Sequence, residues 1–241
     1  MQTALITGAS RGIGRAAARR LAQDGFRVVI HYNRSAQEAQ QLADELIAAH
    51  GADAVRLAKA DVADRDQVAR LFEEIGTVDV LVNNAGIAQQ KLFTDLTEQD
   101  WDSMFNVDVK GVFHCCQLAL PRMIANKRGK IINISSMWGQ VGASCEVHYS
   151  AAKAAVIGLT KALAKEVGPS GIQVNCIAPG VIQTEMNAHL SPETMEELRE
   201  ETPLETLGTP EDVAAMISFL AGKESDFITG QVFGVNGGMI I

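Results

Sequence analysis

The chain has 241 residues, of which 47% are hydrophobic and 21% are charged, and its formal net charge is −8. This is the composition of a globular protein with ample material for a buried core. The excess of acidic residues argues against a nucleic-acid binder, which presents a basic face, and against docking on an anionic membrane surface. A small acidic enzyme is the expectation that remains.

The amino terminus and the cysteines narrow the class further. "MQTALITGAS" is not a charged leader followed by a long apolar run, and no stretch has the length of a membrane-spanning helix. The four cysteines show no C-x-x-C spacing and no clustering with histidine, so we expect no metal site and reduced thiols in a cytoplasmic protein. Cys145 fits a small buried residue better than an oxidation-sensitive one.

Short apolar runs alternate with helix-period segments along the whole chain. Runs that are apolar on both faces suit a parallel sheet covered on both sides, and repeated strand–helix–strand units give a doubly wound sheet. We therefore predict one α/β domain over residues 1–241, a Rossmann fold with a seven-stranded parallel sheet. The predicted strands are 3–7, 27–31, 54–58, 78–83, 129–135, 172–178 and 231–235, and the clearest helices are 36–49, 65–75 and 151–167.

A glycine-rich turn follows the first predicted strand. "LITGASRGIG" places Gly8, Gly12 and Gly14 between that strand and the next helix, a spacing one residue looser than the commoner dinucleotide fingerprint. Glycines let the backbone approach a pyrophosphate, and the helix N-terminus offers unpaired N–H groups. A tight turn would also need glycine, but the strand–turn–helix context favours a dinucleotide site.

The end of the second strand indicates which dinucleotide fits. An NAD-binding enzyme usually presents a carboxylate there, whereas this chain has Tyr32 and no acidic residue before Glu38. Arg34 and Ser35 follow, and Arg11 lies in the glycine turn, so a 2′-phosphate would be attracted. We predict NADPH rather than NADH, although Arg34 alone also fits a solvated loop residue.

Two polar motifs follow the third and fourth strands. "ADV" contains Asp61 and Val62, and "NNAG" spans residues 83–86. Both fall at the carboxyl edge of the sheet, where open α/β folds bind ligands. Asp61 can accept a hydrogen bond from an adenine amine, and Ala85 and Gly86 let a cofactor pass close to the backbone. Asp61 as a helix N-cap, and asparagines that tie adjacent strands together, are alternatives.

Two places interrupt the pattern. Pro121 falls inside the helical stretch 101–126, so we expect that helix to kink or restart there. A long connection follows the sixth strand, and a connection of that length in a compact domain is usually a lid or binding loop. We predict a substrate lid over about residues 183–208.

Ser136, Tyr149 and Lys153 occur in this order in "SSMWGQVGASCEVHYSAAK". Tyr149 and Lys153 are four residues apart, so on one helix they share a face. A free tyrosine has a pKa near ~10, but an ammonium ~4–5 Å away stabilises the phenolate by roughly 3–4 kcal/mol, and burial opposes this. We expect the balance to bring the pKa of Tyr149 towards neutrality, so that it can protonate an alkoxide while Ser136 bonds the substrate carbonyl. Packing roles for Tyr149 and Lys153 are the alternative, and Ser135 is expected to be a supporting hydrogen bonder.

Together these motifs resemble the short-chain dehydrogenase/reductase family over essentially the whole chain. "TGASRGIG", "NNAG", "YSAAK", "MFNVDVKGVF" and "APGVIQT" are similar to its successive motifs. The resemblance implies reduction of a ketone by NADPH, with Asn106 as a fourth catalytic residue beside Ser136, Tyr149 and Lys153. It implies that Thr184 holds the carboxamide of the cofactor. The cofactor contacts that it implies are Gly8, Ser10, Arg11, Gly12, Ile13, Gly14, Tyr32, Asn33, Arg34, Ser35, Asp61, Val62, Asn83, Ala85, Gly86, Pro179, Gly180, Ile182 and Thr184.

Within that family the chain most resembles bacterial 3-oxoacyl-(acyl-carrier-protein) reductases. "GPSGIQVNCIAPGVIQTEM", "GTPEDVA" and "ITGQVFGVNGG" are similar to that group, which is typically tetrameric and docks an acidic carrier protein on basic residues. Lys127 and Arg128 fall in a suitable place, whereas Ser170 stands where an arginine often occurs. The lid is acidic and would repel such a carrier; it contains Glu185, Glu193, Glu196, Glu197, Glu200, Glu201 and Glu205 against Arg199.

Three other functions stay open. "SSMWGQVGASCEVHYSAAK" and "TEMNAHLS" also resemble reductases of a 5-aminopentanone group on a lysine of elongation factor P, and Glu146 can pair with the ammonium of that group. Glu146 is equally well explained as a surface or N-cap residue. Reduction of small free ketones, diketones or steroids is another hypothesis. A non-enzymatic dinucleotide sensor is disfavoured because both Tyr149 and Lys153 are present.

The chain is also expected to self-associate. The helices at 101–126 and 149–168 contain the long apolar stretches "VFHCCQLAL" and "AAVIGLTKALA", and in the family they pack against the same helices of a partner. The apolar tail "GGMII" resembles ends that form a second interface. We therefore expect a homotetramer, with packing on the sheet alone as the alternative.

Overall fold

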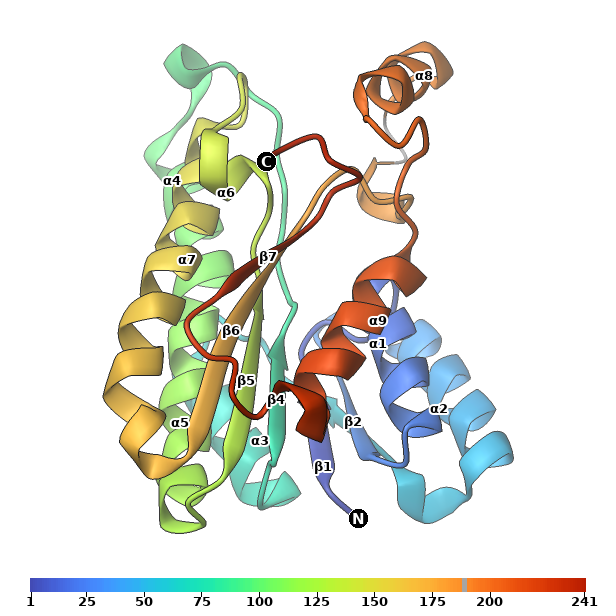
Figure 1. The fold of residues 1–241 in the computed structure, drawn as a ribbon, viewed down its shortest axis with the longest axis vertical. Coiled ribbons are helices and arrows are strands. Elements are labelled where there is room, and N and C mark those ends of the chain that lie inside the picture. Colours follow the sequence, from blue (N-terminus) through green and yellow to red (C-terminus); the bar gives the residue numbers. More distant parts are fainter. Residues whose placement is uncertain (188–189) are drawn as a thin grey trace.

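The computed structural model describes residues 1–187 and 190–241, so the predicted lid includes two residues outside the described part. Its centre is a seven-stranded parallel sheet in the order β3-β2-β1-β4-β5-β6-β7 (Figure 1). The predicted doubly wound fold is confirmed, and every predicted strand overlaps an observed one. The strands are β1 (Thr3–Ile6), β2 (Arg27–Tyr32), β3 (Val55–Lys59), β4 (Val80–Asn83), β5 (Gly129–Ile134), β6 (Ile172–Pro179) and β7 (Val232–Val235).

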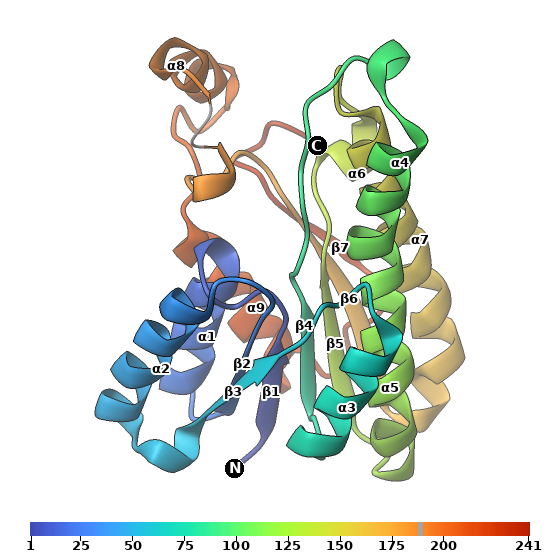
Figure 2. The ribbon, with the colours of Figure 1, turned by 180° about the vertical axis from the view of Figure 1, so that it is seen from behind.

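Helices cover both faces of this sheet, as Figures 1 and 2 show from opposite sides. One layer consists of α1 (Gly12–Gln23), α2 (Ala36–His50) and α9 (Pro210–Ala221). The other layer consists of α3 (Arg65–Ile75), α4 (Glu98–Phe105), α5 (Gly111–Ala125) and α7 (Val147–Val167). Two further helices lie beyond the carboxyl ends of the strands, namely α6 (Trp138–Val141) and α8 (Pro192–Glu201).

The apolar runs of the strands supply two hydrophobic cores. Side chains alternate along a strand, so Leu5 of β1 packs under the α3, α5 and α7 layer while Ile6 packs under α1, α2 and α9. Both residues are fully buried. The inner strands β1, β2, β4, β5 and β6 are therefore covered on both faces, which explains their continuous apolar sequences, whereas the edge strands β3 and β7 are partly exposed. Among the described residues, no helix is both long and apolar enough to cross a membrane.

We expected the helix to kink or restart at Pro121, and the restart is wrong. Helix α5 continues through Pro121 to Ala125, and the irregularity lies earlier, in a π-helical turn at Asn106–Lys110 between α4 and α5. Pro121 and Gln117 both lie on the exposed side of α5. Water can therefore bond the Gln117 carbonyl that Pro121 leaves without an N–H partner, so the helix need not end.

All four cysteines are free thiols. Three are buried, and burial raises the pKa of Cys116 to about 12 and that of Cys176 to about 11. Cys145 is half-exposed, contrary to the buried position that we expected. No cluster of histidine, cysteine and acidic side chains suited to a metal ion occurs in the described parts of the chain.

The chain reverses its direction of sheet growth between β1 and β4. Strands β2 and β3 extend the sheet on one side of β1, while β4 starts its growth on the other side. The carboxyl ends of β1 and β4 are held together by Thr7, whose hydroxyl oxygen accepts hydrogen bonds from Asn84 N (2.9 Å) and Ala85 N (3.0 Å). Loops that leave these two strands diverge to opposite faces, and the crevice between them is the ligand site of open α/β folds.

Candidate active site

The glycine turn forms one side of the crevice. Gly8 and Gly12 have positive φ angles of 64° and 52°, which favour glycine, and a Cβ on Gly14 would lie 2.6 Å from Asn84 Nδ2. Helix α1 begins after Arg11 with no side-chain cap and no acidic residue in its first turn, whereas Asp64 caps α3 and Thr97 caps α4. The N–H groups of α1 therefore suit a phosphate ligand.

A buried histidine holds the glycine turn through a hydrogen bond. His31 of β2 is 2% exposed; its Nδ1 accepts from Gly8 N at 3.1 Å, so its Nε2 carries the proton and donates to Ala60 O at 3.1 Å. Burial lowers the pKa of His31 to about 4, which keeps the ring neutral. Nothing in the sequence motifs identifies this role, because a histidine in an apolar strand is usually a core residue.

The loop after β2 fits a 2′-phosphate. Tyr32 ends the strand half-buried, Asn33, Arg34 and Arg11 are exposed, and Ser35 precedes α2. The first acidic residue after Tyr32 is Glu38, inside α2. A phosphate at this place would meet guanidinium and hydroxyl donors and no carboxylate from the strand end.

The loop after β3 holds Asp61 in a turn of its own. Asp61 Oδ1 accepts from Ala63 N at 2.9 Å, and the N-cap of α3 is Asp64, so the N-cap alternative for Asp61 is wrong. Val62 is buried and packs closely on Gly111, where a Cβ would lie 2.8 Å from its side chain. The adenine contact of Asp61 stays a prediction.

The asparagines at the end of β4 tie strands together, as the alternative interpretation held. Asn83 Nδ2 donates to Asn133 Oδ1 of β5 at 2.8 Å, and Asn84 Nδ2 donates to the carbonyls of Thr7 and Gly8 at 2.9 and 3.1 Å. Asn83 is 3% exposed, which places its amide inside the sheet. Asn83 is not among the residues that line the pocket, and its contact with a cofactor stays a prediction.

A pocket of about 620 Å³ opens at this edge of the sheet. Ser136, Tyr149 and Lys153 all line it, so the structure brings together three of the four predicted catalytic residues. Ile13 comes from the start of α1, and the segment after β6 closes another side. The predicted cofactor contacts that line this pocket are Ile13, Gly86, Pro179, Gly180, Ile182 and Thr184.

Tyr149 and Lys153 face each other on α7. The Lys153 ammonium lies 5.5 Å from the centre of the Tyr149 ring, and both side chains are buried. Lys153 alone does not produce the expected lowering of the Tyr149 pKa. Burial raises the pKa of Tyr149 above its ordinary value, and this effect exceeds the opposing effect of the Lys153 charge.

The two serines at the end of β5 have different roles. Ser136 Oγ accepts from Trp138 N at 3.2 Å, and a hydrogen bond from Ser136 to Tyr149 favours the phenolate and opposes the rise in the Tyr149 pKa. Ser135 Oγ donates to the Lys153 carbonyl at 2.8 Å, so Ser135 holds α7 in place as a supporting residue, as predicted.

The π-helical turn brings an unexpected residue to this group. Asn106 begins the turn half-buried and is not among the residues that line the pocket. Two residues later, the fully buried Asp108 places Oδ2 2.9 Å from Lys153 Nζ. In the sequence Asp108 is one charge among several in a helical stretch, and no spacing rule connects it to α7. Only the fold shows this contact.

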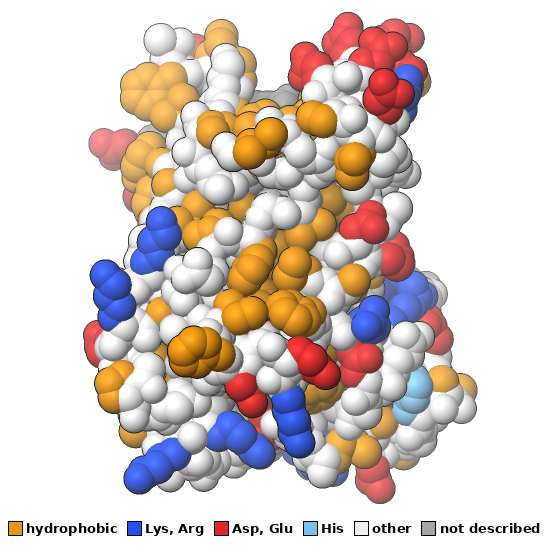
Figure 3. All heavy atoms as spheres, in the orientation of Figure 1, with side chains coloured by type: hydrophobic (Ala, Val, Ile, Leu, Met, Phe, Trp, Pro, Cys, Tyr) orange, Lys and Arg blue, Asp and Glu red, His pale blue; other side chains and the backbone are white. Residues whose placement is uncertain are grey.

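The outer half of the pocket is lined by apolar and polar side chains from several elements. Trp138 comes from α6 and Leu198 from α8, while Gln90 donates from its amide to Glu146 Oε1 at 3.2 Å. Acidic side chains gather over α8 at the pocket mouth (Figure 3), and this helix buries none of its residues. Arg199 pairs with Glu196 at 2.6 Å and offsets only part of that charge.

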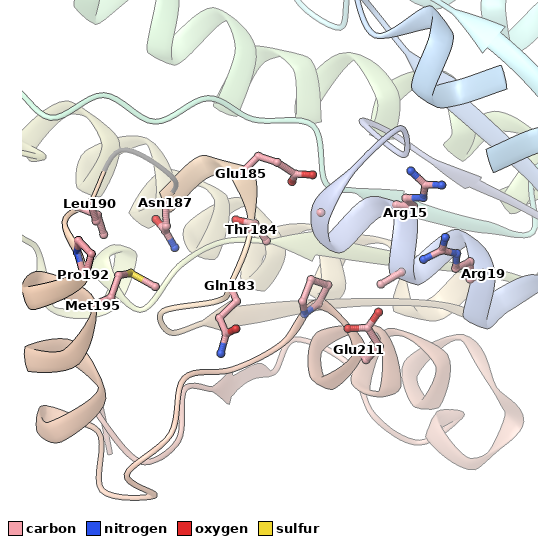
Figure 4. A pocket seen from close by; sticks show the side chains of 13 residues that line it. Arg15, Arg19, Gln183, Thr184, Glu185, Asn187, Leu190, Pro192, Met195 and Glu211 are labelled. Carbon is pink, nitrogen blue, oxygen red and sulfur yellow. The ribbon is translucent and has the colours of Figure 1, made fainter. Parts of the chain in front are cut away.

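A second hollow of about 620 Å³ lies beside the glycine turn (Figure 4). It adjoins the pocket just described, and Thr184, Asn187 and Leu190 line both. Its rim contains Arg15 and Arg19 of α1 and Glu211 of α9. A Cβ on Gly12 would lie 3.4 Å from Thr184 Cγ2, so the chain after β6 rests against the glycine turn.

Comparison with known proteins agrees with this geometry. Residues 8–240 match the family described as Enoyl-(Acyl carrier protein) reductase. The chain is 44% identical to 3-oxoacyl-(acyl-carrier-protein) reductase FabG of Staphylococcus aureus strain Mu50, over 99% of this chain and 98% of the relative. The protein belongs to the short-chain dehydrogenase/reductase family.

Other members of the family are similarly close. The chain is 42% identical to 3-oxoacyl-(acyl-carrier-protein) reductase FabG of Thermotoga maritima, covering 98% of this chain and 97% of the relative. The crystal structure of 3-oxoacyl-(acyl-carrier protein) reductase from Brucella melitensis superposes with a TM-score of 0.94 at 35% identity, covering 98% of this chain and 90% of that one. Family members are oxidoreductases that bind a nicotinamide dinucleotide.

Lys127 and Arg128 do not lie where we expected a carrier protein to dock on this short-chain dehydrogenase/reductase. Both residues precede β5, at the amino end of the strand, whereas Ser136 and the pocket lie at its carboxyl end. Arg128 pairs there with Asp79 at 2.8 Å. Within one chain they therefore cannot flank the pocket, because a sheet strand separates them from it.

Proposed function

We propose that the protein is an NADPH-dependent carbonyl reductase that reduces a 3-oxoacyl thioester to the 3-hydroxyacyl product. The observation that carries this proposal is the convergence of two hydroxyl groups, those of Ser136 and Tyr149, on one pocket beside the glycine turn. Reduction of a ketone develops negative charge on its oxygen, and two donors aimed at that oxygen stabilise it.

Each residue of the site has a separate role in the proposed reduction. Ser136 Oγ donates a hydrogen bond to the substrate carbonyl oxygen, and Tyr149 transfers its phenolic proton to that oxygen as the alkoxide forms. The Lys153 ammonium stabilises the phenolate that Tyr149 leaves behind. Ser135 fixes the backbone of α7 at Lys153 and so holds the orientation of the pair. Asn106 stays a predicted fourth catalytic residue.

The residues of the crevice fit NADPH. The uncapped N-terminus of α1 and the turn at Gly8 and Gly12 suit the pyrophosphate, while Arg11 and Arg34 suit the 2′-phosphate. Thr184 and Ile182 are proposed to hold the nicotinamide side. When bound, the dinucleotide supplies a hydride to the carbonyl carbon.

Carbonyl reduction accounts for the site better than reduction of a carbon–carbon double bond, the activity in the name of the matching family. The proton that Tyr149 can release lies beside Ser136, and both groups suit a reacting oxygen. The curated relatives are named for 3-oxoacyl reduction. The apolar wall with Trp138 and Leu198 provides contacts for an acyl chain.

A second candidate, a 5-aminopentanone reductase acting on elongation factor P, is favoured by the charge around the pocket. Glu146 lines the pocket and lies within hydrogen-bonding distance of Gln90, where it can receive a substrate ammonium. The acidic surface of α8 would attract a cationic group and repel an acidic carrier protein. A reductase of small free ketones is the remaining alternative.

The proposal extends to the lid and the assembly. We propose that residues 183–208 cover the substrate and that the chain, acting in the cytoplasm, forms a homotetramer. Large apolar side chains stay exposed on the helices expected at the interface, among them Phe113 and Ile124 of α5 and Val147 of α7. Phe227 and the carboxyl-terminal Ile241 are also exposed. A monomeric mass measured by light scattering would contradict the proposed homotetramer.

An NADPH-oxidation screen tests the function. Acetoacetyl thioesters of a carrier protein and of a small thiol, a crotonyl thioester, free diketones and an aminopentanone-bearing protein are offered in turn. We expect turnover of the acetoacetyl thioesters and none of the crotonyl thioester. Turnover of the aminopentanone protein alone supports the second candidate, and turnover of the crotonyl thioester alone contradicts the assignment of carbonyl chemistry.

A further inference from the structure

The pair Asp108–Lys153 differs from the other ion pairs between described residues because both side chains are buried. Lys153 Nζ lies 2.9 Å from Asp108 Oδ2, and the two side chains are 7% and 0% exposed. In each of the other pairs at least one partner is substantially exposed. Water and salt screen a pair buried to this degree much less than they screen the exposed pairs, so the charge of Asp108 acts more strongly on its neighbours.

The fold holds the carboxylate of Asp108 on both of its oxygens. Oδ1 accepts from Ile87 N at 2.9 Å, and Oδ2 faces Lys153. A Cβ on Gly86 would lie 2.8 Å from Asp108 Oδ2 and 3.2 Å from Lys153 Nζ, so the glycine leaves space for the pair. Asp108 reaches this position through the π-helical turn, which interrupts the regular spacing of α4 and α5.

Charged side chains from several elements act on the proposed proton donor and on its neighbour Lys153. Tyr149 faces Lys153 on its own helix, Asp108 from the π-helical turn and Glu146 at the helix start. Lys153 faces Asp108, Tyr149 and Cys176 of β6. Burial is the first cause of the raised pKa of Tyr149, and Asp108 raises it further. Burial is the largest single effect on Lys153 and lowers its pKa. The charge and hydrogen bond of Asp108, together with Tyr149 and Cys176, outweigh burial and raise the pKa, so the ammonium persists.

We propose that Asp108 is a positioning residue that offsets the charge of Lys153 and so keeps the proton on Tyr149 over a wider pH range. This inference rests on the proposed function, in which the phenolic O–H bond breaks as the O–H bond of the product alcohol forms. Reduction needs the phenol and alcohol oxidation needs the phenolate. Asp108 therefore extends the range over which the site reduces and delays alcohol oxidation to more alkaline pH.

The chain offers a direct test because it contains two tyrosines, Tyr32 and Tyr149. In a Tyr32→Phe background, the ultraviolet absorbance of phenolate reports the titration of Tyr149 alone. We expect Asp108→Asn to lower the pKa of Tyr149 by at least about one unit, because it removes a nearby buried negative charge. The matched control is Asp79→Asn, which removes the carboxylate of an ion pair at the other edge of the sheet and should leave this titration unchanged.

The pH profile of alcohol oxidation provides the second readout. In Asp108→Asn its inflection should move to lower pH by the same amount, and ketone reduction should begin to fall at lower pH, which a purely structural role would not produce. A titration and profile that do not move would overturn the proposal. If Asp108→Asn does not fold, the Tyr32→Phe protein decides: a Tyr149 pKa at or below about 10, the ordinary value, contradicts the proposal.

The titration separates this inference from the proposed function. A wild-type protein that reduces no ketone while the phenolate titration shifts as expected would refute the function and support the coupling between Asp108 and Tyr149. A wild-type protein that reduces ketones while the titration stays unmoved would refute the coupling alone.

Discussion

Helices α7 and α8 both line the same pocket and differ in nearly every other respect. Helix α7 has 21 residues, packs against the sheet and buries Tyr149 and Lys153. Helix α8 has 10 residues, buries none of them and is predominantly acidic. The difference fits our proposal that the proton chemistry belongs to the buried wall of the pocket and that α8 affects which substrates approach it. Buried groups keep fixed positions, and exposed charges act mainly on approach.

The largest expected effect lies in the buried wall. Lys153→Met should lower the free energy of unfolding by about 3–5 kcal/mol, because it leaves the Asp108 carboxylate buried without its partner. The double variant Asp108→Asn/Lys153→Met should recover most of that loss but no reductase activity. Urea unfolding measures both proteins. A double variant as unstable as Lys153→Met would show that packing, and not the unpaired charge, causes the loss.

The buried support of the glycine turn should make stability depend on pH. The pKa of His31 is about 4 in the folded protein and 6.5 in the unfolded chain, so the unfolded chain binds the proton first as the pH falls. The stabilisation is complete above pH 6.5 and declines by about 3 kcal/mol as the pH falls through about 4. His31→Asn should flatten this decline.

The matched control for His31 is His50→Asn, at the exposed end of α2. It should keep the decline of the wild-type protein. Urea unfolding at several pH values gives the comparison, and a decline that persists unchanged in His31→Asn would remove His31 as its source.

A smaller effect is expected at the exposed loop after β2. Arg34→Ala should raise the KM for NADPH by about 10-fold and leave the KM for NADH nearly unchanged, because only NADPH has a phosphate for the guanidinium to bind. Arg70→Ala, which removes an exposed arginine of α3, is the control. Steady-state kinetics with both dinucleotides measures the effect. Equal losses with NADPH and NADH would contradict the 2′-phosphate contact.

The smallest effect is expected on α8. Replacing Glu197, Glu200 and Glu201 by glutamine should lower the KM for a carrier-protein substrate by only a few-fold at low salt, because these exposed charges are screened. The KM for a small thioester should not change. Glutamines at Glu73 and Glu74 of α3 provide the control. A loss of turnover with both substrates would place α8 in the chemistry and remove the contrast with α7.

The sequence was most informative where a motif depends on local geometry. The glycine turn follows its strand directly, and Tyr149 and Lys153 are one helical turn apart, so their spacing alone places them together. The apolar runs predicted all seven strands because a parallel sheet buries both faces.

Contacts between distant segments could not be predicted in this way. Asp108 meets Lys153, and His31 meets Gly8, only after the sheet has formed. The pKa of Tyr149 depends on the same contacts, because the fold pairs the Lys153 ammonium with Asp108, and the Asp108 charge adds to the effect of burial in raising this pKa. The sequence motifs do not place Lys127 and Arg128 relative to the pocket, because that position depends on which end of β5 these residues occupy.

The central claim, that Tyr149 supplies the proton for ketone reduction, is tested most directly by Tyr149→Phe. Reduction of an acetoacetyl thioester is followed by the loss of NADPH absorbance, and NADPH binding is measured separately on the same protein. The account predicts a loss of about 10²-fold or more in turnover with NADPH binding nearly unchanged. Turnover retained in Tyr149→Phe would contradict it.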